Sequence, residues 1–280
     1  MAQPMLTEAA SEPVLSLKNA TLRFGQRTLW EDLTLTVKPG EFVAILGPNG
    51  AGKTSLLKVL LGLNELAEGD IRIGGQLPHR GNSEIGYIPQ QKSFDRDLPI
   101  RGRDLVHFGF DGHRFGFVRH DKNAWHRVDE VIKEVGATQY ANSPIGLLSG
   151  GEQQRLRIAQ ALLGKPSLLL CDEPLLSLDL KSQQAVSELI DSYRKRFNTA
   201  VMLVTHDVNP VLTMVDRVLY LVGGKWAIGT PEEVLTTKCL SRLYGTPVDV
   251  LRVRDRIIVV NTSENEHHHI DKQPVETDHE

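Results

Sequence analysis

Short apolar runs alternate with stretches of helical periodicity along most of this chain. The runs 41–46 (EFVAIL), 167–172 (SLLLCD) and 199–205 (TAVMLVT) have the length of fully buried strands. Residues 123–135 instead carry an apolar stripe at helical spacing. This order of strands and helices predicts an α/β fold whose core is a mainly parallel sheet, interrupted by a helical subdomain at about 90–164.

Strand-like segments surround the first apolar run and recur near the end of the chain. We expect the segments between about Val14 and Gly75 to include an antiparallel β subdomain. Thr230-Pro231 predicts the start of a short capped helix. Residues 248–253 and 256–260 then predict a terminal hairpin.

The two ends of the chain have a different composition. Residues 1–13 are small and polar, and we interpret them as a mobile leader. Residues 262–280 are acidic, polar and low in aromatic residues, so we expect a disordered tail. A single folded domain is therefore predicted over residues 14–261.

A phosphate-binding loop follows the first apolar run. After Leu46 the chain reads GPNGAGKT, and a helix is expected at 55–63. The glycines permit conformations in which successive backbone N–H groups point into one concavity, which suits a polyphosphate. We expect Lys53 to reach the β- and γ-phosphates of ATP and the Thr54 hydroxyl to ligate Mg²⁺. The predicted nucleotide contacts are Gly47, Pro48, Asn49, Gly50, Ala51, Gly52, Lys53, Thr54 and Ser55.

Two adjacent carboxylates end the second apolar run. A buried strand would deliver Asp172 to the edge of the sheet, where it can hold Mg²⁺ through water. Glu173 is then placed to orient or deprotonate the attacking water. Paired carboxylates also occur in solvated turns, but a phosphate-binding loop in the same chain favours the catalytic interpretation.

The string LSGGEQQR at 148–155 forms a second phosphate-directed element. Ser149 and Glu152 have the spacing of a capping box that starts a helix running to about Leu163. Gly150 and Gly151 offer bare N–H groups at that helix N-terminus, so we predict that these four residues also bind nucleotide. Two such elements but one phosphate-binding loop suggest a homodimer that sandwiches two ATP molecules head to tail.

These motifs, with DEPLLSLD (172–179) and Thr205-His206, resemble the nucleotide-binding subunits of ABC transporters over roughly Val14 to Val260. The resemblance implies an ABC-type ATPase fold and ATP hydrolysis coupled to transport. It also implies integral membrane permease subunits as partners, and indirectly an extracytoplasmic substrate-binding protein.

The resemblance further implies roles for individual residues. Gln90 would sense Mg²⁺ and face the membrane subunit, and Asp179 would belong to the loop that crosses between the two ATPase subunits. His206 would contact the γ-phosphate, although a histidine after a core strand can be merely structural. Phe24 would stack on adenine, although its strand-like context also allows a position in the core.

Composition agrees with this interpretation. The chain has 280 residues, with 32 Lys and Arg against 35 Asp and Glu, so no basic field indicates nucleic acid. Cys171 and Cys239 indicate no disulfide framework. No run of 18 apolar residues and no signal peptide is present, so we expect a peripheral protein at the cytoplasmic face of the cell membrane.

Three other classes of protein are alternatives to a transporter subunit. Chromosome-maintenance ATPases place hundreds of coiled-coil residues between the two motifs, and here fewer than a hundred intervene. Translation-associated ABC proteins carry two cassettes in one chain, and this chain has one. A scaffold with inactive motifs would be expected to lack Lys53, Asp172, Glu173 or His206, and all four are present.

Four strings, at 94–100, 112–119, 144–146 and 243–247, are similar to the zinc and manganese branch of importers. They imply a divalent metal ion as the cargo without choosing the metal. The alternative is an importer of iron-siderophore, haem or cobalamin.

Ten histidines invite a metal-binding interpretation. Imidazoles in the acidic tail could bind a transition metal, but we favour a solvated tail. Four of them, His107, His113, His120 and His126, lie in the helical insert, and four others, His267, His268, His269 and His279, lie in the tail.

Overall fold

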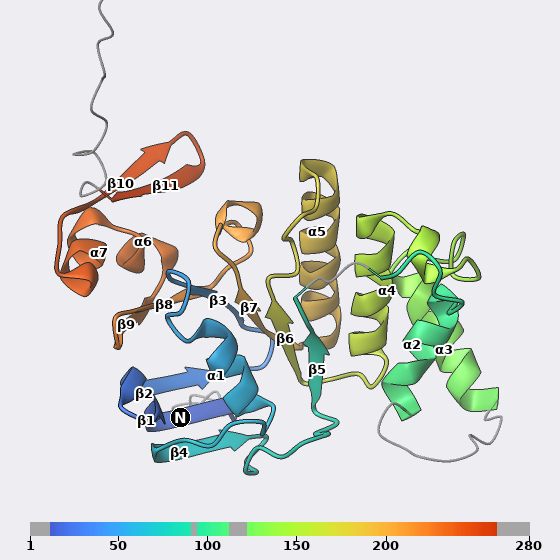
Figure 1. The fold of residues 1–280 in the computed structure, drawn as a ribbon, viewed down its shortest axis with the longest axis horizontal. Helices are drawn as coiled ribbons and strands as arrows, with labels where there is room; N and C mark the ends of the chain where they lie inside the picture. The colour runs from blue at the N-terminus through green and yellow to red at the C-terminus, as the bar shows by residue number, and fades with distance from the viewer. Residues whose placement is uncertain (1–11, 91–93, 112–121, 262–280) are drawn as a thin grey trace, which may run out of the picture.

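A six-stranded sheet with the strand order β5-β6-β7-β3-β8-β9 lies at the centre of the structure (Figure 1). The computed structural model describes residues 12–90, 94–111 and 122–261. All neighbouring strands from β5 to β8 in this order pair in parallel, and β9 pairs antiparallel with β8 at one edge of the sheet. The strands are β3 (Phe42–Leu46), β5 (Ile85–Ile88), β6 (Leu168–Asp172), β7 (Ala200–Val204), β8 (Arg217–Val222) and β9 (Lys225–Gly229).

A three-stranded antiparallel sheet lies beside this core, with the order β2-β1-β4. Its strands are β1 (Leu15–Phe24), β2 (Arg27–Val37) and β4 (Glu68–Ile73). Helix α1 (Lys53–Leu60) lies between the two sheets, and one apolar cluster joins all three elements. The cluster includes the fully buried Trp30 of β2, Ile45 of β3 and Leu57 of α1.

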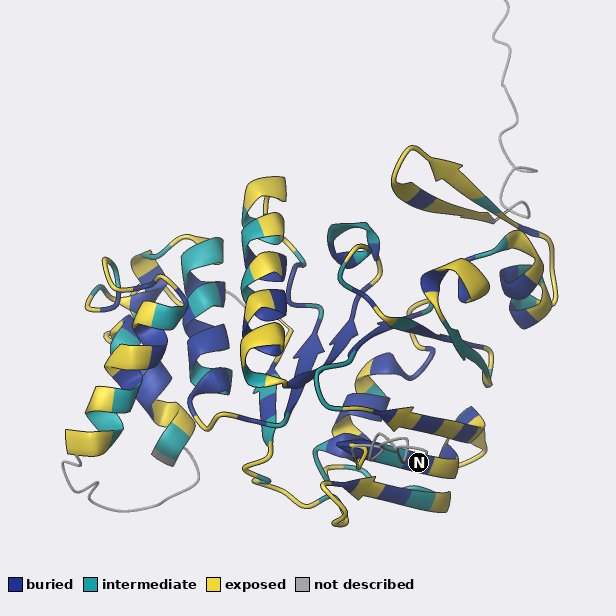
Figure 2. Cartoon of the chain, turned by 180° about the vertical axis from the view of Figure 1, so that it is seen from behind, coloured by how far each residue is buried: buried dark blue, intermediate teal, exposed yellow. Residues whose placement is uncertain are grey.

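Helices cover the opposite face of the central sheet. Figure 1 shows α4 and α5 beside β5 and β6, with α2 and α3 farther out. A second apolar cluster joins these helices to the sheet, and Figure 2 shows buried residues along the sheet-facing sides of the helices. The elements are α2 (Gly102–Asp111), α3 (Lys122–Glu134), η1 (Ile145–Leu147), α4 (Gly150–Leu162) and α5 (Leu180–Phe197).

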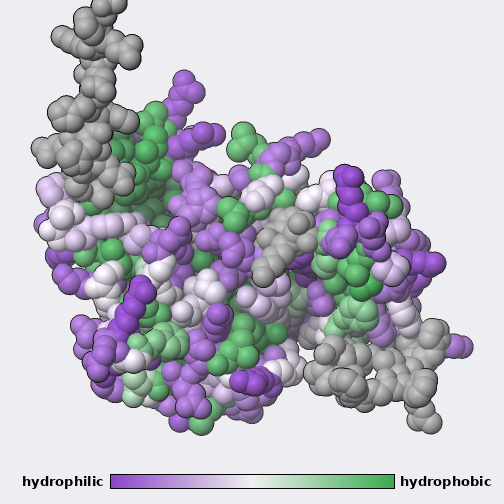
Figure 3. Space-filling view, viewed as in Figure 1, coloured by the Kyte–Doolittle hydropathy of each residue, from purple (hydrophilic) through white to green (hydrophobic). Residues whose placement is uncertain are grey.

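The C-terminal part of the described chain packs near the β8–β9 side of the sheet (Figure 1). It contains α6 (Pro231–Val234), α7 (Thr237–Tyr244), β10 (Val248–Val253) and β11 (Arg256–Asn261), whereas η2 (Asn209–Val211), which lies between β7 and β8 in the chain, contacts α5. Strands β10 and β11 form an antiparallel hairpin. Its outer face carries exposed apolar side chains, among them Leu251 and Ile258, and Figure 3 shows apolar atoms gathered in this region.

The predicted α/β class, with a mainly parallel core, an antiparallel part and inserted helices, is confirmed. The capped helix after Thr230 is present, and the hairpin has the predicted strands, with β11 one residue longer. The prediction for α1 was wrong at both ends. The helix begins at Lys53, because Gly52 already caps it in a left-handed conformation, and it ends at Leu60 before the left-handed Gly62.

Several predictions fall on parts of the chain outside the described residues. These are most of the leader (1–13), the tail (262–280), the string 112–119, and the histidines at 113, 120, 267–269 and 279. The division into leader, ATPase domain and tail therefore stays a prediction. Across the ranges that the structure does describe, no helix combines the length and the apolar character needed to cross a membrane.

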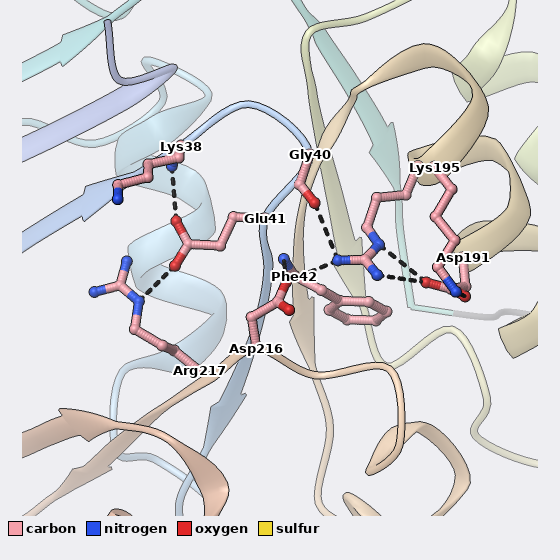
Figure 4. Close-up of polar contacts among 9 residues, drawn as sticks. Lys38, Gly40, Glu41, Phe42, Asp191, Lys195, Asp216 and Arg217 are labelled. Atoms are coloured by element: carbon pink, nitrogen blue, oxygen red, sulfur yellow. Dashed lines mark hydrogen bonds and ion pairs between the residues drawn. The ribbon is translucent and has the colours of Figure 1, made fainter. Parts of the chain in front are cut away.

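An ionic cluster around the buried Arg194 and Asp191 holds α5 against the amino-terminal edge of the sheet (Figure 4). Arg194 donates to Asp191 at 2.9 Å, to Asp216 at 2.7 Å and to the carbonyl of Gly40 at 3.0 Å. Asp216 also accepts from the backbone N–H of Phe42 at 2.8 Å. The first residues of β3, the residue before β8 and helix α5 are thereby joined at one point.

We expect Arg194→Met to lower the free energy of unfolding by about 3 kcal/mol, because it leaves the buried Asp191 carboxylate short of its main partner. Chemical denaturation of the full chain measures this change. Lys195→Met is the matched control, because Lys195 pairs with the same carboxylate at 2.7 Å but is 66% exposed. That control should cost less than about 1 kcal/mol. Equal losses in both variants would contradict the role assigned to Arg194.

Candidate active site

The parallel strands bring four sequence motifs to one edge of the sheet. Gly47 follows β3, Asp172 ends β6, His206 lies two residues after β7, and Gln90 lies two residues after β5. Strand β7 lies between β3 and β6, so the motifs are neighbours in space although they are far apart in the sequence. In open α/β sheets this carboxyl edge is where ligands bind.

Two glycines of the loop after β3 are required by their surroundings. A Cβ atom at Gly47, where φ is +139°, would lie 2.0 Å from the carbonyl oxygen of Leu221. Gly52, with φ of +96°, caps α1, and a Cβ there would lie 3.0 Å from the indole of Trp30. The loop is therefore held between β8 and the antiparallel sheet, with its N–H groups at the start of α1.

Lys53 is held inside this loop. Its ammonium donates to the carbonyl of Gly47 at 2.7 Å and to that of Pro48 at 3.0 Å. The residue is 6% exposed, and this burial lowers the pKa of the ammonium, although Glu173 and Asp172 oppose the shift. A cation in a poorly solvated loop of N–H groups is well suited to a polyphosphate.

Asp172 and Thr54 meet across 118 residues of sequence. The Thr54 hydroxyl donates to Oδ1 of Asp172 at 3.1 Å. Asp172 is 3% exposed, and burial raises the pKa of its carboxyl, while the hydrogen bond from Thr54 acts in the opposite direction. Two oxygen-bearing side chains are thus held together beside the loop in a site that disfavours an uncompensated carboxylate.

Glu173 leaves the strand in a strained conformation. Its φ of +48° is in the left-handed region, which a non-glycine residue adopts at a cost. Its backbone N–H donates to the carbonyl of Val204 at 2.9 Å, and its Oε2 accepts from Nε2 of Gln90 at 3.3 Å. The turn therefore directs the carboxylate away from the sheet and toward the residues after β5.

Glu173 lines two hollows at this edge. One, of about 460 Å³, is shared with the loop, Gln90 and Phe24. The other, of about 90 Å³, is shared with Thr205 and His206.

Phe24 is 49% exposed, so the alternative of a core position for its ring is wrong.

The signature residues stand on a separate element. Ser149 caps α4, and its capping box with Glu152 is present as predicted, with the Ser149 N–H donating to Oε2 of Glu152 at 2.8 Å. Asp179 precedes α5 at its N-cap. Neither of the two hollows is lined by Ser149, Gly150, Gly151 or Asp179. Figure 1 also shows the start of α4 away from the start of α1, where the phosphate loop ends.

Two residues near the site were not identified from the sequence. Arg27 lies opposite Phe24 in the β1–β2 register, lines the larger hollow, and donates to the carbonyl of Gly50 at 3.0 Å. A tight turn at Gly25-Gln26 is the signal that could have paired them. Asn209 hydrogen-bonds to Asp207, next to His206, and no local pattern indicated it.

Comparisons with known proteins agree with this geometry. The ABC transporter family model matches residues 30–176. A zinc import ATP-binding protein of Halorhodospira halophila is 37% identical over 85% of this chain and 86% of its own length. A manganese transport system ATP-binding protein of Halalkalibacterium halodurans is 33% identical, over 89% of this chain and 99% of its own length.

Solved structures show the same fold. A metal-chelate type ABC transporter in an inward-facing conformation has 25% identity and a TM-score of 0.76, covering 90% of this chain and all of that one. A dimeric ATP-binding cassette bound to ADP and phosphate has 28% identity and a TM-score of 0.61, covering 76% of this chain and 97% of that one. The chain belongs to the ABC transporter family, and it is an ABC-type ATPase of that family.

We expect Glu173→Gln to keep ATP binding within about twofold of wild type, because it preserves the size of the side chain. Turnover should fall by about 10²- to 10⁴-fold, the usual loss when a general base is removed. Equilibrium nucleotide binding and phosphate release measure the two effects.

Two further variants complete this test. Lys53→Ala should lose nucleotide binding itself, because the phosphates lose their countercharge. Glu188→Gln, which neutralises an exposed carboxylate on α5, should turn over like wild type. Wild-type turnover in Glu173→Gln would exclude Glu173 as the base.

Proposed function

We propose that this chain hydrolyses ATP to energise an importer of a divalent metal ion, zinc or manganese. The observation that carries the ATPase part is the convergence of Lys53, Asp172, Glu173 and His206 at one edge of the sheet. The metal cargo is supported by the names of the two relatives, which describe zinc import and manganese transport.

The loop and its lysine bind the phosphates in this proposal. The backbone N–H groups from Gly47 to Thr54 surround the triphosphate, and Lys53 leaves the loop carbonyls to contact its terminal phosphates. Phe24, exposed at the rim of the larger hollow, stacks on the adenine ring.

Glu173 orients the attacking water and accepts its proton, with Gln90 holding the carboxylate from the other side. His206 shares the smaller hollow with Glu173 and donates a hydrogen bond to the γ-phosphate. Water attack on the phosphorus then releases ADP and phosphate.

The donor set beside the loop fits Mg²⁺. Thr54, Asp172 and Gln90 provide oxygen atoms, which this cation prefers. The raised pKa of the buried Asp172 carboxyl also fits a site whose charge a cation compensates. Bound there, Mg²⁺ would neutralise charge on the β- and γ-phosphates.

Assembly as a homodimer completes the site. The signature residues Ser149, Gly150, Gly151 and Glu152 of one copy, with its Asp179, bind the nucleotide held by the loop of the other copy. The separation of signature and loop within one chain supports this, as does the dimeric cassette among the similar structures. The dimer sits on membrane permease subunits at the cytoplasmic face of the membrane and serves an extracytoplasmic binding protein only through them.

One observation favours the second candidate cargo. The similar transporter of metal-chelate type supports an importer of iron-siderophore, haem or cobalamin. Its identity to this chain is 25%, against 37% and 33% for the zinc and manganese relatives, so we favour the metal ion.

Metal uptake tests the cargo. A strain that lacks this chain should lose high-affinity uptake of radiolabelled zinc or manganese. The wild-type gene should restore uptake and the Glu173→Gln gene should not. Uptake of a ferric siderophore in the same strain serves as the contrast. A defect confined to the siderophore would exclude the divalent-metal proposal and favour the second candidate.

Mixed dimers test the shared site. Lys53→Ala and Gly150→Asp should each be inactive alone, because each removes one half of both composite sites. Mixing them should restore part of the ATPase activity, since one site of the heterodimer keeps Lys53 of one copy and Gly150 of the other. A lack of recovery despite demonstrated mixed dimers would contradict the shared site.

A further inference from the structure

The side-chain amide of Asn209 joins the C-terminal hairpin to the loop that carries His206. Nδ2 of Asn209 donates to the carbonyl oxygen of Ile257 at 3.0 Å, and its Oδ1 accepts from the N–H of Ile257 at 2.8 Å. The two residues are 48 positions apart in the sequence. Because the amide meets both backbone groups of one residue, it fixes the orientation of β11 as well as its distance. Strand β11 pairs with β10 on one side, and Asn209 takes the place of a next strand on the other.

The same amide continues into the His206 loop. Oδ1 of Asp207 accepts from the backbone N–H of Asn209 at 2.9 Å and from its Nδ2 at 2.7 Å. Thr205 and Asp207 are joined across His206, since the Thr205 hydroxyl donates to the Asp207 carbonyl at 2.7 Å and accepts from its N–H at 3.2 Å. A chain of hydrogen bonds therefore runs from the hairpin backbone to the residues on both sides of His206.

Packing supports the same connection. Ile257 and Val208 are each 6% exposed and belong to one apolar cluster. A hollow of about 420 Å³ has the hairpin as one wall, the phosphate loop as another, and residues 206–208 between them. A movement of β11 would therefore shift the wall against which the His206 loop rests.

We propose that Asn209 is a positioning residue that couples the C-terminal hairpin to His206 and so sets the rate of ATP hydrolysis. This inference rests on the proposed function, in which His206 contacts the γ-phosphate. Asn209 itself does not line the hollows that hold Glu173. Its loss should therefore lower kcat and leave ATP affinity nearly unchanged, because Lys53 and Phe24, which hold the phosphates and the adenine in the proposed function, do not belong to this chain of hydrogen bonds.

The structure supplies a matched control on the other strand of the hairpin. The Ser241 hydroxyl of α7 donates to the carbonyl of Val248 at 3.2 Å and accepts from its N–H at 3.0 Å. This is also a two-point contact between one side chain and one hairpin residue, but it leads to α7 and not to His206. If Asn209 merely stabilises the hairpin, Asn209→Ala and Ser241→Ala should have the same effect on catalysis.

The test uses the purified full chain and measures kcat, the KM for ATP, equilibrium ATP binding and thermal unfolding. Asn209→Ala should lower kcat by about tenfold to a hundredfold, the loss expected when a reacting group is misplaced. Its ATP affinity should stay within about twofold of wild type. Asn209→Asp keeps the oxygen that accepts from Ile257 but has no N–H for the Ile257 carbonyl, and kcat should also fall. Ser241→Ala should retain the wild-type kcat.

A double variant identifies the route of the effect. If Asn209 acts through His206, the His206→Ala/Asn209→Ala chain should be no slower than His206→Ala alone, because both changes remove the same interaction. Additive losses, an unchanged kcat in Asn209→Ala, or an equal loss in Ser241→Ala would each overturn the coupling while leaving the proposed function intact. Wild-type turnover in His206→Ala would instead refute the role of His206 in the proposed function, and the coupling with it.

Discussion

The parallel pairing of β3, β7 and β6 is the constraint on which the rest of the structure depends. Because neighbouring parallel strands point the same way, the phosphate loop, His206 and the Asp172–Glu173 pair all emerge at one edge. An antiparallel β7 would send His206 to the opposite edge. Apolar clusters cover both faces of the sheet and keep these strands buried, so the positions of the strand ends are fixed by the core. The ionic cluster around Arg194 joins the opposite end of β3 to the residue before β8 and to α5.

The site contains buried charged groups and a strained backbone conformation, both of which cost folding free energy and are held in place by the core. Lys53 and Asp172 are almost fully buried. Burial lowers the pKa of Lys53 and raises that of Asp172, so that it favours the neutral form of each group. Glu173 is held in the left-handed region by its position at the strand end. Such costs are tolerated where the surrounding packing fixes the backbone, and they are typical of sites whose charges and strain serve a bound ligand.

Much of the fold could be predicted from the sequence. The three apolar runs are strands to within one residue at each end, and the capping box at Ser149 and the terminal hairpin are present. These features depend on neighbours in the sequence, so local patterns are sufficient. The helix after the phosphate loop was placed too late, because Gly52 caps it from within the loop. The roles given to individual site residues remain predictions.

The sequence by itself determined which residues are candidates for phosphate-directed chemistry, since the glycine spacing of the loop and the apolar runs that end in polar residues are local properties of the chain. Only the tertiary structure decided which of these residues meet. Thr54 contacts Asp172, Gln90 contacts Glu173, and Asn209 contacts Ile257. The physical reason is that such contacts depend on the order of strands in the sheet and on where the hairpin packs. Burial of many side chains at once sets both, and no short segment contains that information.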